Sequence, residues 1–196
     1  MIDVGCGTGE ILNSVKNLYP AASIYGIDIS EEMLKKAKEK LLNAAEISLG
    51  DAEHLPFENG MFDVLICTDS FHHYPNPQKA VKEFYRVLRN GGYLLLADFW
   101  KPFPVRQLMN IFIPFSNEGD VKIYSQNEIV DLLMHNGFQE HFSTLAGICP
   151  LTPPHRHFCP PAALKKHIFA PKVYRETKCF ENAVTRHLNP CRSPDL

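Results

Sequence analysis

Several features that mark other protein classes are missing from this chain of 196 residues. No apolar run approaches the ~20 residues that span a bilayer, and no basic segment followed by an apolar signal core opens the sequence. The formal net charge is -2, so the chain lacks the basic excess that gathers phosphates or anionic lipid. These absences predict a cytoplasmic protein with a small-molecule ligand, no nucleic-acid partner and no membrane span.

Cysteine is sparse and irregularly spaced. Six cysteines are too few and too scattered for a secreted disulfide framework, and no C-x-x-C pair occurs. His155, His157 and Cys159 stand close together, but short Cys/His clusters without such a pair are mostly not metal ligands. The sequence therefore predicts reduced cysteines and no metal site.

Glycine is absent after Gly147, and the composition changes at the same point. Residues 148–196 hold eight of the fifteen prolines and four of the six cysteines. The net charge also reverses, from -7 over residues 1–147 to +5 over residues 148–196. We therefore expect a folded domain over residues 1–147 and an atypical, poorly ordered basic tail over residues 148–196.

Short apolar runs alternate with helical patterns in the first part, as in a parallel sheet with crossover helices. Strands are expected at residues 1–4, 23–28, 46–49, 64–68 and 93–98. The pattern predicts an α/β fold with a Rossmann-like, doubly wound, mostly parallel sheet in three αβα layers.

Three of the expected helices carry explicit end signals. Ser30 caps a helix that places Met33, Ala37 and Leu41 on one face. A second helix opens at Asn76-Pro77 and ends before Gly91-Gly92. The third begins with the capping box of Ser125 and Glu128 and stops at Gly137.

The stretch DVGCGTG follows the first apolar run and precedes a helix. Glycines 5, 7 and 9 allow a ligand to approach the backbone N–H groups of this turn. Asp28 stands 19 positions after Gly9, where an acidic residue usually accepts hydrogen bonds from a ribose hydroxyl pair. This pattern predicts a nucleoside-binding site.

The dinucleotide fingerprint G-x-G-x-x-G is not complete here. The spacing is G-x-G-x-G, and Glu10 takes the place of the close-packing glycine. An acidic residue in the turn would repel a pyrophosphate over the helix start. We therefore expect a ligand without a pyrophosphate, and an NAD(P)-linked oxidoreductase is the less favoured alternative.

Five further segments follow this turn in a recognisable order. They are GIDIS, GDAEHLPF, FDVLICTDSFHHYPNP, RVLRNGGYLLLAD and YSQNEIVDLLMHNGF. Together with the glycine turn, these segments resemble the class I S-adenosylmethionine-dependent methyltransferases, in the small-molecule branch often called type 11. The resemblance implies S-adenosylmethionine as cofactor and a small-molecule methyl acceptor.

The resemblance also implies a set of cofactor contacts. By this resemblance Gly5, Cys6 and Gly7 cradle the methionine part of the cofactor, and Asp3 braces the loop and helps to orient the amino-acid head. Asp28 accepts hydrogen bonds from both ribose hydroxyls, Ile29 flanks the adenine, and Asp51 accepts from the adenine amine. The Ala52 N–H donates to an adenine ring nitrogen, and the Thr68 carbonyl accepts from the cofactor's ammonium. Two alternatives stay open: Asp51 as a solvated turn acid and Thr68 as a simple strand end.

No catalytic residue is assigned, because a sulfonium methyl is already activated and needs mainly an aligned nucleophile. His72 and His73 fit either an acid–base role or, as the resemblance implies, the pocket wall. Phe71, Tyr74, Phe99 and Trp100 indicate an apolar or planar acceptor, or ordinary packing. The apolar stretch at residues 99–115 is expected to be a lid or a cover for the sheet.

In the resembling family a helical segment precedes the glycine turn, and an antiparallel seventh strand lies between the fifth and sixth. Only two residues precede Asp3 here, and the prolines between Ile148 and Leu164 argue against a central strand. The alternative to an active enzyme is therefore a non-catalytic cofactor-binding fragment with weak binding, low stability and little turnover.

Overall fold

The computed structural model describes residues 1–116, 119–140 and 167–169. Its strands are β1 (Ile2–Val4), β2 (Tyr25–Asp28), β3 (Glu46–Leu49), β4 (Phe62–Thr68), β5 (Leu88–Ala97), β6 (Gln139–Glu140) and β7 (His167–Phe169). Its helices are α1 (Glu10–Leu18), α2 (Glu31–Leu41), α3 (Pro77–Val87), α4 (Val105–Phe112) and α5 (Gln126–His135), with short 3₁₀ turns η1 (Phe71–His73) and η2 (Ile113–Phe115).

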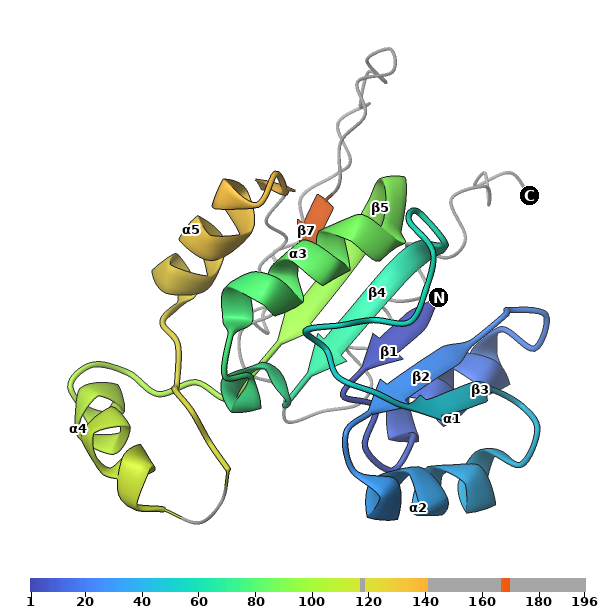
Figure 1. Cartoon of the computed structure of the whole chain (residues 1–196), viewed down its shortest axis with the longest axis horizontal. Coiled ribbons are helices and arrows are strands. Elements are labelled where there is room, and N and C mark those ends of the chain that lie inside the picture. Colours follow the sequence, from blue (N-terminus) through green and yellow to red (C-terminus); the bar gives the residue numbers. More distant parts are fainter. Residues whose placement is uncertain (117–118, 141–166, 170–196) are drawn as a thin grey trace, which may run out of the picture.

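The strands form one sheet in the order β3-β2-β1-β4-β5-β7-β6 (Figure 1). Every pairing described in it is parallel, which confirms the predicted Rossmann-like architecture. The chain runs outward from β1 to β3, then returns to β4 on the other side of β1. A switch point therefore lies between β1 and β4, where open α/β sheets bind ligands beyond the carboxyl ends of their strands.

Alternate residues of β4 face two different hydrophobic clusters. Val64 and Ile66 belong to the cluster that contains residues of α1 and α2, whereas Leu65 and Cys67 belong to the one that contains residues of α3 and α5. A strand buried on both faces needs apolar residues at consecutive positions, as the sequence FDVLICT provides. The three-layer αβα arrangement is thereby confirmed.

The expected strand at residues 46–49 coincides with β3, whereas the boundary between α3 and β5 differs from the prediction. Helix α3 ends at Val87 and β5 begins directly at Leu88, so Gly91-Gly92 do not stop the helix. They lie inside β5, where Phe62 of β4 pairs with Leu88 and the register then shifts. Gly91 has φ of 77° there, which serves the irregular strand.

The predicted capping of α2 and α5 is confirmed, but one buried position was wrong. Ser30 Oγ accepts from the Met33 N–H, and Ser125 with Glu128 forms a full capping box. Leu34, not Met33, is buried in α2 together with the predicted alanine and leucine of this face. The spacing of three and four residues from Leu34 onward keeps these side chains on one stripe.

Strand β7 lies between β5 and β6, inside the stretch that the sequence analysis assigned to the tail. It pairs parallel with both neighbours, so a strand occupies the position in the sheet where the sequence analysis expected none. The strand is parallel here, whereas the resemblance implies an antiparallel one. The segment between Ile148 and Leu164, including the cluster of His155, His157 and Cys159, lies outside the described residues.

Within the described ranges, no helix combines the length and the apolar character required to cross a membrane.

Arg86 of α3 holds the loop between β3 and β4 in place. Its guanidinium donates to the carbonyls of Leu55 and Phe57 at 2.8 and 2.6 Å and pairs with Glu83 at 2.7 Å. Glu83 in turn accepts from the Leu55 N–H at 2.8 Å. This network fixes the loop that begins with Asp51 at the edge of the sheet.

Arg86→Ala should destabilise the chain by roughly 1.5–3 kcal/mol, because carbonyls and a carboxylate lose a charged donor. Arg89→Ala is the matched control, since its ion pair with Asp63 is 60% and 57% exposed. That control should shift stability by no more than about 0.5 kcal/mol. Urea unfolding of both variants measures the difference, and equal losses would contradict the role of Arg86.

Candidate functional site

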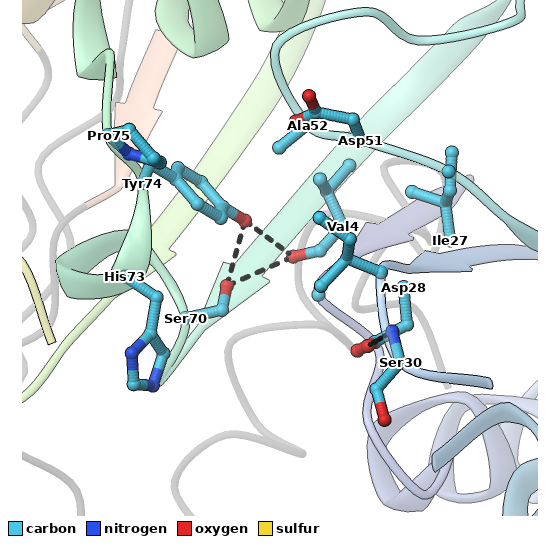
Figure 2. Close-up of a pocket in the computed structure, with 13 residues that line it drawn as sticks. Val4, Ile27, Asp28, Ser30, Asp51, Ala52, Ser70, His73, Tyr74 and Pro75 are labelled. Carbon is cyan, nitrogen blue, oxygen red and sulfur yellow. Dashed lines mark hydrogen bonds between the residues drawn. The ribbon is translucent and has the colours of Figure 1, made fainter. Parts of the chain in front are cut away.

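A pocket opens beyond the carboxyl ends of β1 and β2, at the switch point of the sheet (Figure 2). Its wall comes from four places: the glycine turn, the end of β2, the start of the β3–β4 loop and the segment after β4. The lining residues are Val4, Gly5, Ile27, Asp28, Ile29, Ser30, Gly50, Asp51, Ala52, Ser70, His73, Tyr74 and Pro75.

The glycine turn is tied to the end of β2 by backbone and side-chain hydrogen bonds. The N–H groups of Gly5 and Cys6 both donate to the Ile27 carbonyl, at 2.8 and 3.0 Å. The Gly7 N–H donates to Asp28 Oδ2 at 2.8 Å, and the Ser30 N–H donates to Asp28 Oδ1 at 2.9 Å. Asp28 therefore orients the turn as well as facing the pocket.

Each Asp28 oxygen accepts one of these backbone hydrogen bonds and keeps further acceptor capacity for a ligand hydroxyl. Beside it, the Ile29 side chain is 76% exposed at the pocket wall, where an apolar ring could cover it. Asp51 Oδ1 accepts from the Glu53 N–H at 2.9 Å, and Ala52 is buried. The arrangement suits a nucleoside with a diol at one end and a flat ring at the other.

The floor of the pocket includes two hydroxyl groups, of which the sequence analysis missed that of Ser70. Ser70 Oγ and Tyr74 Oη lie 2.9 Å apart and donate to the Val4 carbonyl at 3.3 and 3.4 Å (Figure 2). Ser70 is adjacent to Gly5, where a Cβ would lie 2.4 Å from its oxygen. No local sequence signal marks Ser70, because the contact joins residues from two different strand ends.

Asp3 is buried beneath the turn, and its Oδ1 has no hydrogen-bond partner among the described residues. Burial, with the nearby charge of Asp28 adding to it, raises the pKa of Asp3 to about 7. Burial also raises the pKa of the Cys6 thiol. A buried carboxylate without a donor is costly, so this position favours a ligand or a proton that satisfies it.

The nine residues predicted to contact a cofactor divide into two groups. Five of them line the pocket together: Gly5, Asp28, Ile29, Asp51 and Ala52. The others do not line it: Asp3 lies beneath the turn, Cys6 and Gly7 belong to the turn itself, and Thr68 ends β4.

The paired histidines lie in η1, at the exit of β4. His72 Nδ1 is 2.5 Å from Asp98 Oδ1, and only His73 of the two lines the pocket. Burial lowers the pKa of His72, but the hydrogen bond and charge of Asp98, with the charges of Asp120 and Asp69, raise it overall. The two imidazoles therefore have different surroundings and are not equivalent parts of one wall.

The predicted aromatic group is only partly assembled. Tyr74 lines the pocket, whereas Phe71 is fully buried in the core. Phe99 is 40% exposed, with its ring 6.4 Å from that of His72. Helix α4, in the stretch expected to be a lid or cover, projects away from the sheet in Figure 1 and buries none of its residues.

A glycine turn joined to a ribose-type acid at the switch point of a parallel sheet defines a nucleoside-binding domain of the Rossmann-like class. Residues 2–96 match the family model described as "Methyltransferase domain". The match covers just under half of the chain, and it agrees with the resemblance of the sequence to the class I S-adenosylmethionine-dependent methyltransferases. S-adenosylmethionine is the cofactor of this family.

Two curated relatives show how far the likeness extends. The rice (Oryza sativa subsp. japonica) protein named 2-methyl-6-phytyl-1,4-hydroquinone methyltransferase 2, chloroplastic, is 38% identical over 139 residues, which are 63% of this chain and 40% of that protein. Demethylmenaquinone methyltransferase of Thermotoga maritima is 28% identical over 166 residues, covering 74% of this chain and 72% of that protein.

Among solved structures, the YcgJ protein of Bacillus subtilis superposes with a TM-score of 0.63 at 28% identity, covering 70% of this chain and 61% of that one. The chain spans 40% of the length of the rice relative. The family-model match over residues 2–96 includes every residue that lines the pocket, from Val4 to Pro75.

Gly5→Ala should disturb the site far more than Gly7→Ala. Both residues have positive φ, of 76° and 51°, so each alanine carries a backbone cost of about 1–2 kcal/mol. Only at Gly5 would the added Cβ overlap Ser70, whereas nothing lies within 4 Å at Gly7. Overpacking adds about 1–3 kcal/mol. Thermal unfolding of both variants tests this, and equal midpoints would contradict it.

The buried Asp3 predicts a pH-dependent stability. Its pKa is raised from 3.8 to about 7 on folding, so the folded chain keeps a proton that the unfolded chain releases within this window. Stability should therefore fall as pH rises through the window, by at most roughly 4 kcal/mol, and stay low above it.

Asp3→Asn removes this titration while preserving the side-chain shape. The free energy of unfolding of the variant should increase relative to that of the parent as the pH rises from about 4 to 7. Free energies of unfolding measured across this range provide the check, with Asp63→Asn as an exposed control. Parallel curves for the parent and Asp3→Asn would contradict the buried-carboxyl assignment.

Proposed function

We propose that this protein is an S-adenosylmethionine-dependent methyltransferase that acts on a small-molecule acceptor. The observation that carries the proposal is the Asp28 carboxylate, which binds the glycine turn through Gly7 and still faces the pocket. The match of residues 2–96 to the methyltransferase domain model supports the same activity.

The residues of the pocket fit the cofactor at three points. Asp28 has acceptor capacity for the ribose hydroxyls, and the exposed side chain of Ile29 provides an apolar face for the adenine. Asp51 and Ala52 lie at the opposite wall of the pocket, where they would contact the polar edge of the adenine. Gly5, Cys6 and Gly7 would hold the methionine part. The orphaned oxygen of Asp3 lies beneath that turn, where a cationic head would satisfy it.

The chemistry places few demands on the protein beyond position. When bound, the cofactor supplies an activated methyl group on a sulfonium. The chain's own residues then align the acceptor and exclude water, effects with a ceiling of roughly 7–11 kcal/mol. The carbonyl of Thr68, at the end of β4, is the acceptor that we propose for the cofactor's ammonium.

For the acceptor we propose an apolar compound with an oxygen-bearing ring. The names of two relatives refer to a phytyl hydroquinone and to demethylmenaquinone. Phe99, 40% exposed and with its ring 6.4 Å from that of His72, would suit such a molecule. A cytoplasmic location and the absence of a nucleic-acid partner remain predictions from the sequence.

Two alternatives make different predictions for binding. An NAD(P)-linked oxidoreductase should respond to NADH, and a non-catalytic fragment should bind S-adenosylhomocysteine without turnover. Incubation with labelled S-adenosylmethionine and a cell extract, followed by identification of the labelled product, would establish the activity and the acceptor together. A thermal shift with NADH but none with S-adenosylhomocysteine would overturn the cofactor assignment.

Asp28→Asn should weaken S-adenosylhomocysteine binding by about 1.5–3 kcal/mol, because the ribose hydroxyls lose a charged acceptor. Asp63→Asn is the matched control, since Asp63 is exposed and does not line the pocket. Calorimetric titration measures both affinities, and far-ultraviolet circular dichroism confirms that the variants are folded. Equal affinities for Asp28→Asn and the parent would refute the ribose role.

A further inference from the structure

Two histidines and an aspartate come together beside η1, at the border of the pocket. His72 and His73 belong to η1, whereas Asp120 precedes α5 and is distant in sequence. One ligand atom of each side chain lies within 4.8 Å of the other two. The cofactor contacts proposed above use none of these three residues.

The separations suit a small metal ion. His73 Nδ1 lies 3.2 Å and His72 Nε2 lies 3.6 Å from the same oxygen, Asp120 Oδ1. Metal–nitrogen and metal–oxygen bonds of roughly 2.0–2.2 Å in a tetrahedral site place neighbouring ligand atoms about 3.4 Å apart. The two observed separations fall on either side of this value, and all three ligand atoms lie within 4.8 Å of one another.

The surroundings hold the cluster in a binding orientation. Asp98 Oδ1 pairs with His72 Nδ1 at 2.5 Å, which leaves Nε2 as the nitrogen on the Asp120 side. Metal-ligating histidines typically donate their second nitrogen to a carboxylate in this way. The N–H groups of Val121 and Lys122 donate to the His72 carbonyl at 2.8 and 3.2 Å, which fixes the segment that carries Asp120.

The charges around the cluster favour a cation. The side chains of Asp98 and Asp120 are only 6% and 22% exposed. Within the described part of the chain, their ion pairs involve the two histidines and no lysine or arginine. With neutral imidazoles, these poorly hydrated carboxylates leave a negative charge that a divalent ion would neutralise.

We propose that His72, His73 and Asp120 bind a divalent transition-metal ion of the zinc type, with Asp98 orienting His72. Three protein ligands leave a fourth position for water or for a ligand oxygen. His73 also lines the pocket, so the ion would border the space in which an acceptor lies. Metal binding is a property of these side chains and does not rest on the proposed function.

The sequence analysis predicted no metal site, and the cluster that it weighed was His155, His157 and Cys159 of the tail. The site proposed here is formed by other residues. The sequence places His72 and His73 next to each other but gives no indication that Asp120 joins them. Neighbouring histidines alone are a weak signal, and the third ligand comes from a separate loop.

The test is titration of the chelator-treated full chain with Zn²⁺ in the absence of S-adenosylmethionine. The parent should bind one equivalent that His73→Ala and Asp120→Asn both lack. Asp98→Asn keeps all three ligands and should bind that equivalent about 10–100-fold more weakly. His54→Ala is the matched control, because His54 also faces an aspartate, Asp51 at 3.7 Å, but is 70% exposed.

Cobalt substitution separates this site from one built on the chain's cysteines. A site of two imidazoles and a carboxylate gives visible Co²⁺ bands without thiolate charge transfer, and these bands should disappear in both ligand variants. Unfolding midpoints without metal should remain near that of the parent for His73→Ala, whose side chain is 41% exposed. Zinc should raise the midpoints of the parent and of His54→Ala, but not those of His73→Ala and Asp120→Asn.

Equal zinc stoichiometry and affinity in the parent, His73→Ala and Asp120→Asn would overturn the proposal. Thiolate bands that persist in both variants would do the same, by assigning the metal to cysteines. If one ligand variant fails to fold, the other decides. None of these readouts involves methyl transfer. The metal site and the proposed methyltransferase activity are therefore tested independently, and either can be refuted without the other.

Discussion

The pocket depends on the way in which the end of β2 holds the glycine turn after β1. A single carbonyl, that of Ile27, accepts from two successive N–H groups of the turn, and the next side chain, Asp28, accepts from a third. Because β1 and β2 are paired in register as neighbours, these acceptors reach the turn without any intervening segment. The ligand site is thus an extension of the sheet's own hydrogen bonding.

The pocket wall formed by the β3–β4 loop is held by charged side chains of α3 and of the loop itself. Arg86 and Glu83 hold the β3–β4 loop, and Glu53 of that loop accepts from the Asn76 N–H at 2.6 Å, at the start of α3. The loop and the helix therefore brace each other. Charge-assisted hydrogen bonds to backbone groups are among the stronger polar contacts, and they anchor the far wall, which contains little regular structure.

The sequence predicted those parts of the fold that are set by local patterns. Strand β3, the caps at Ser30 and Ser125 and the turn through Gly5 follow from neighbouring residues, and the structure has them. The register shift of β5 at Gly91 and the contact between Ser70 and Gly5 involve partners distant in sequence. No periodicity marks such contacts, and for the same reason the approach of Asp120 to the histidines could not be predicted.

Strand β7 also determines the order in which the sheet can be completed. Its residues, His167–Phe169, are synthesised after those of β6, yet among the described strands β6 pairs with β7 alone. As the chain emerges from the ribosome, the first five strands of the sheet, β1 to β5, can assemble together with the pocket. One edge of β5 stays unpaired until β7 has been synthesised. Unpaired strand edges recruit other chains. The interval between these two segments is therefore the period in which the nascent protein most needs protection from its neighbours.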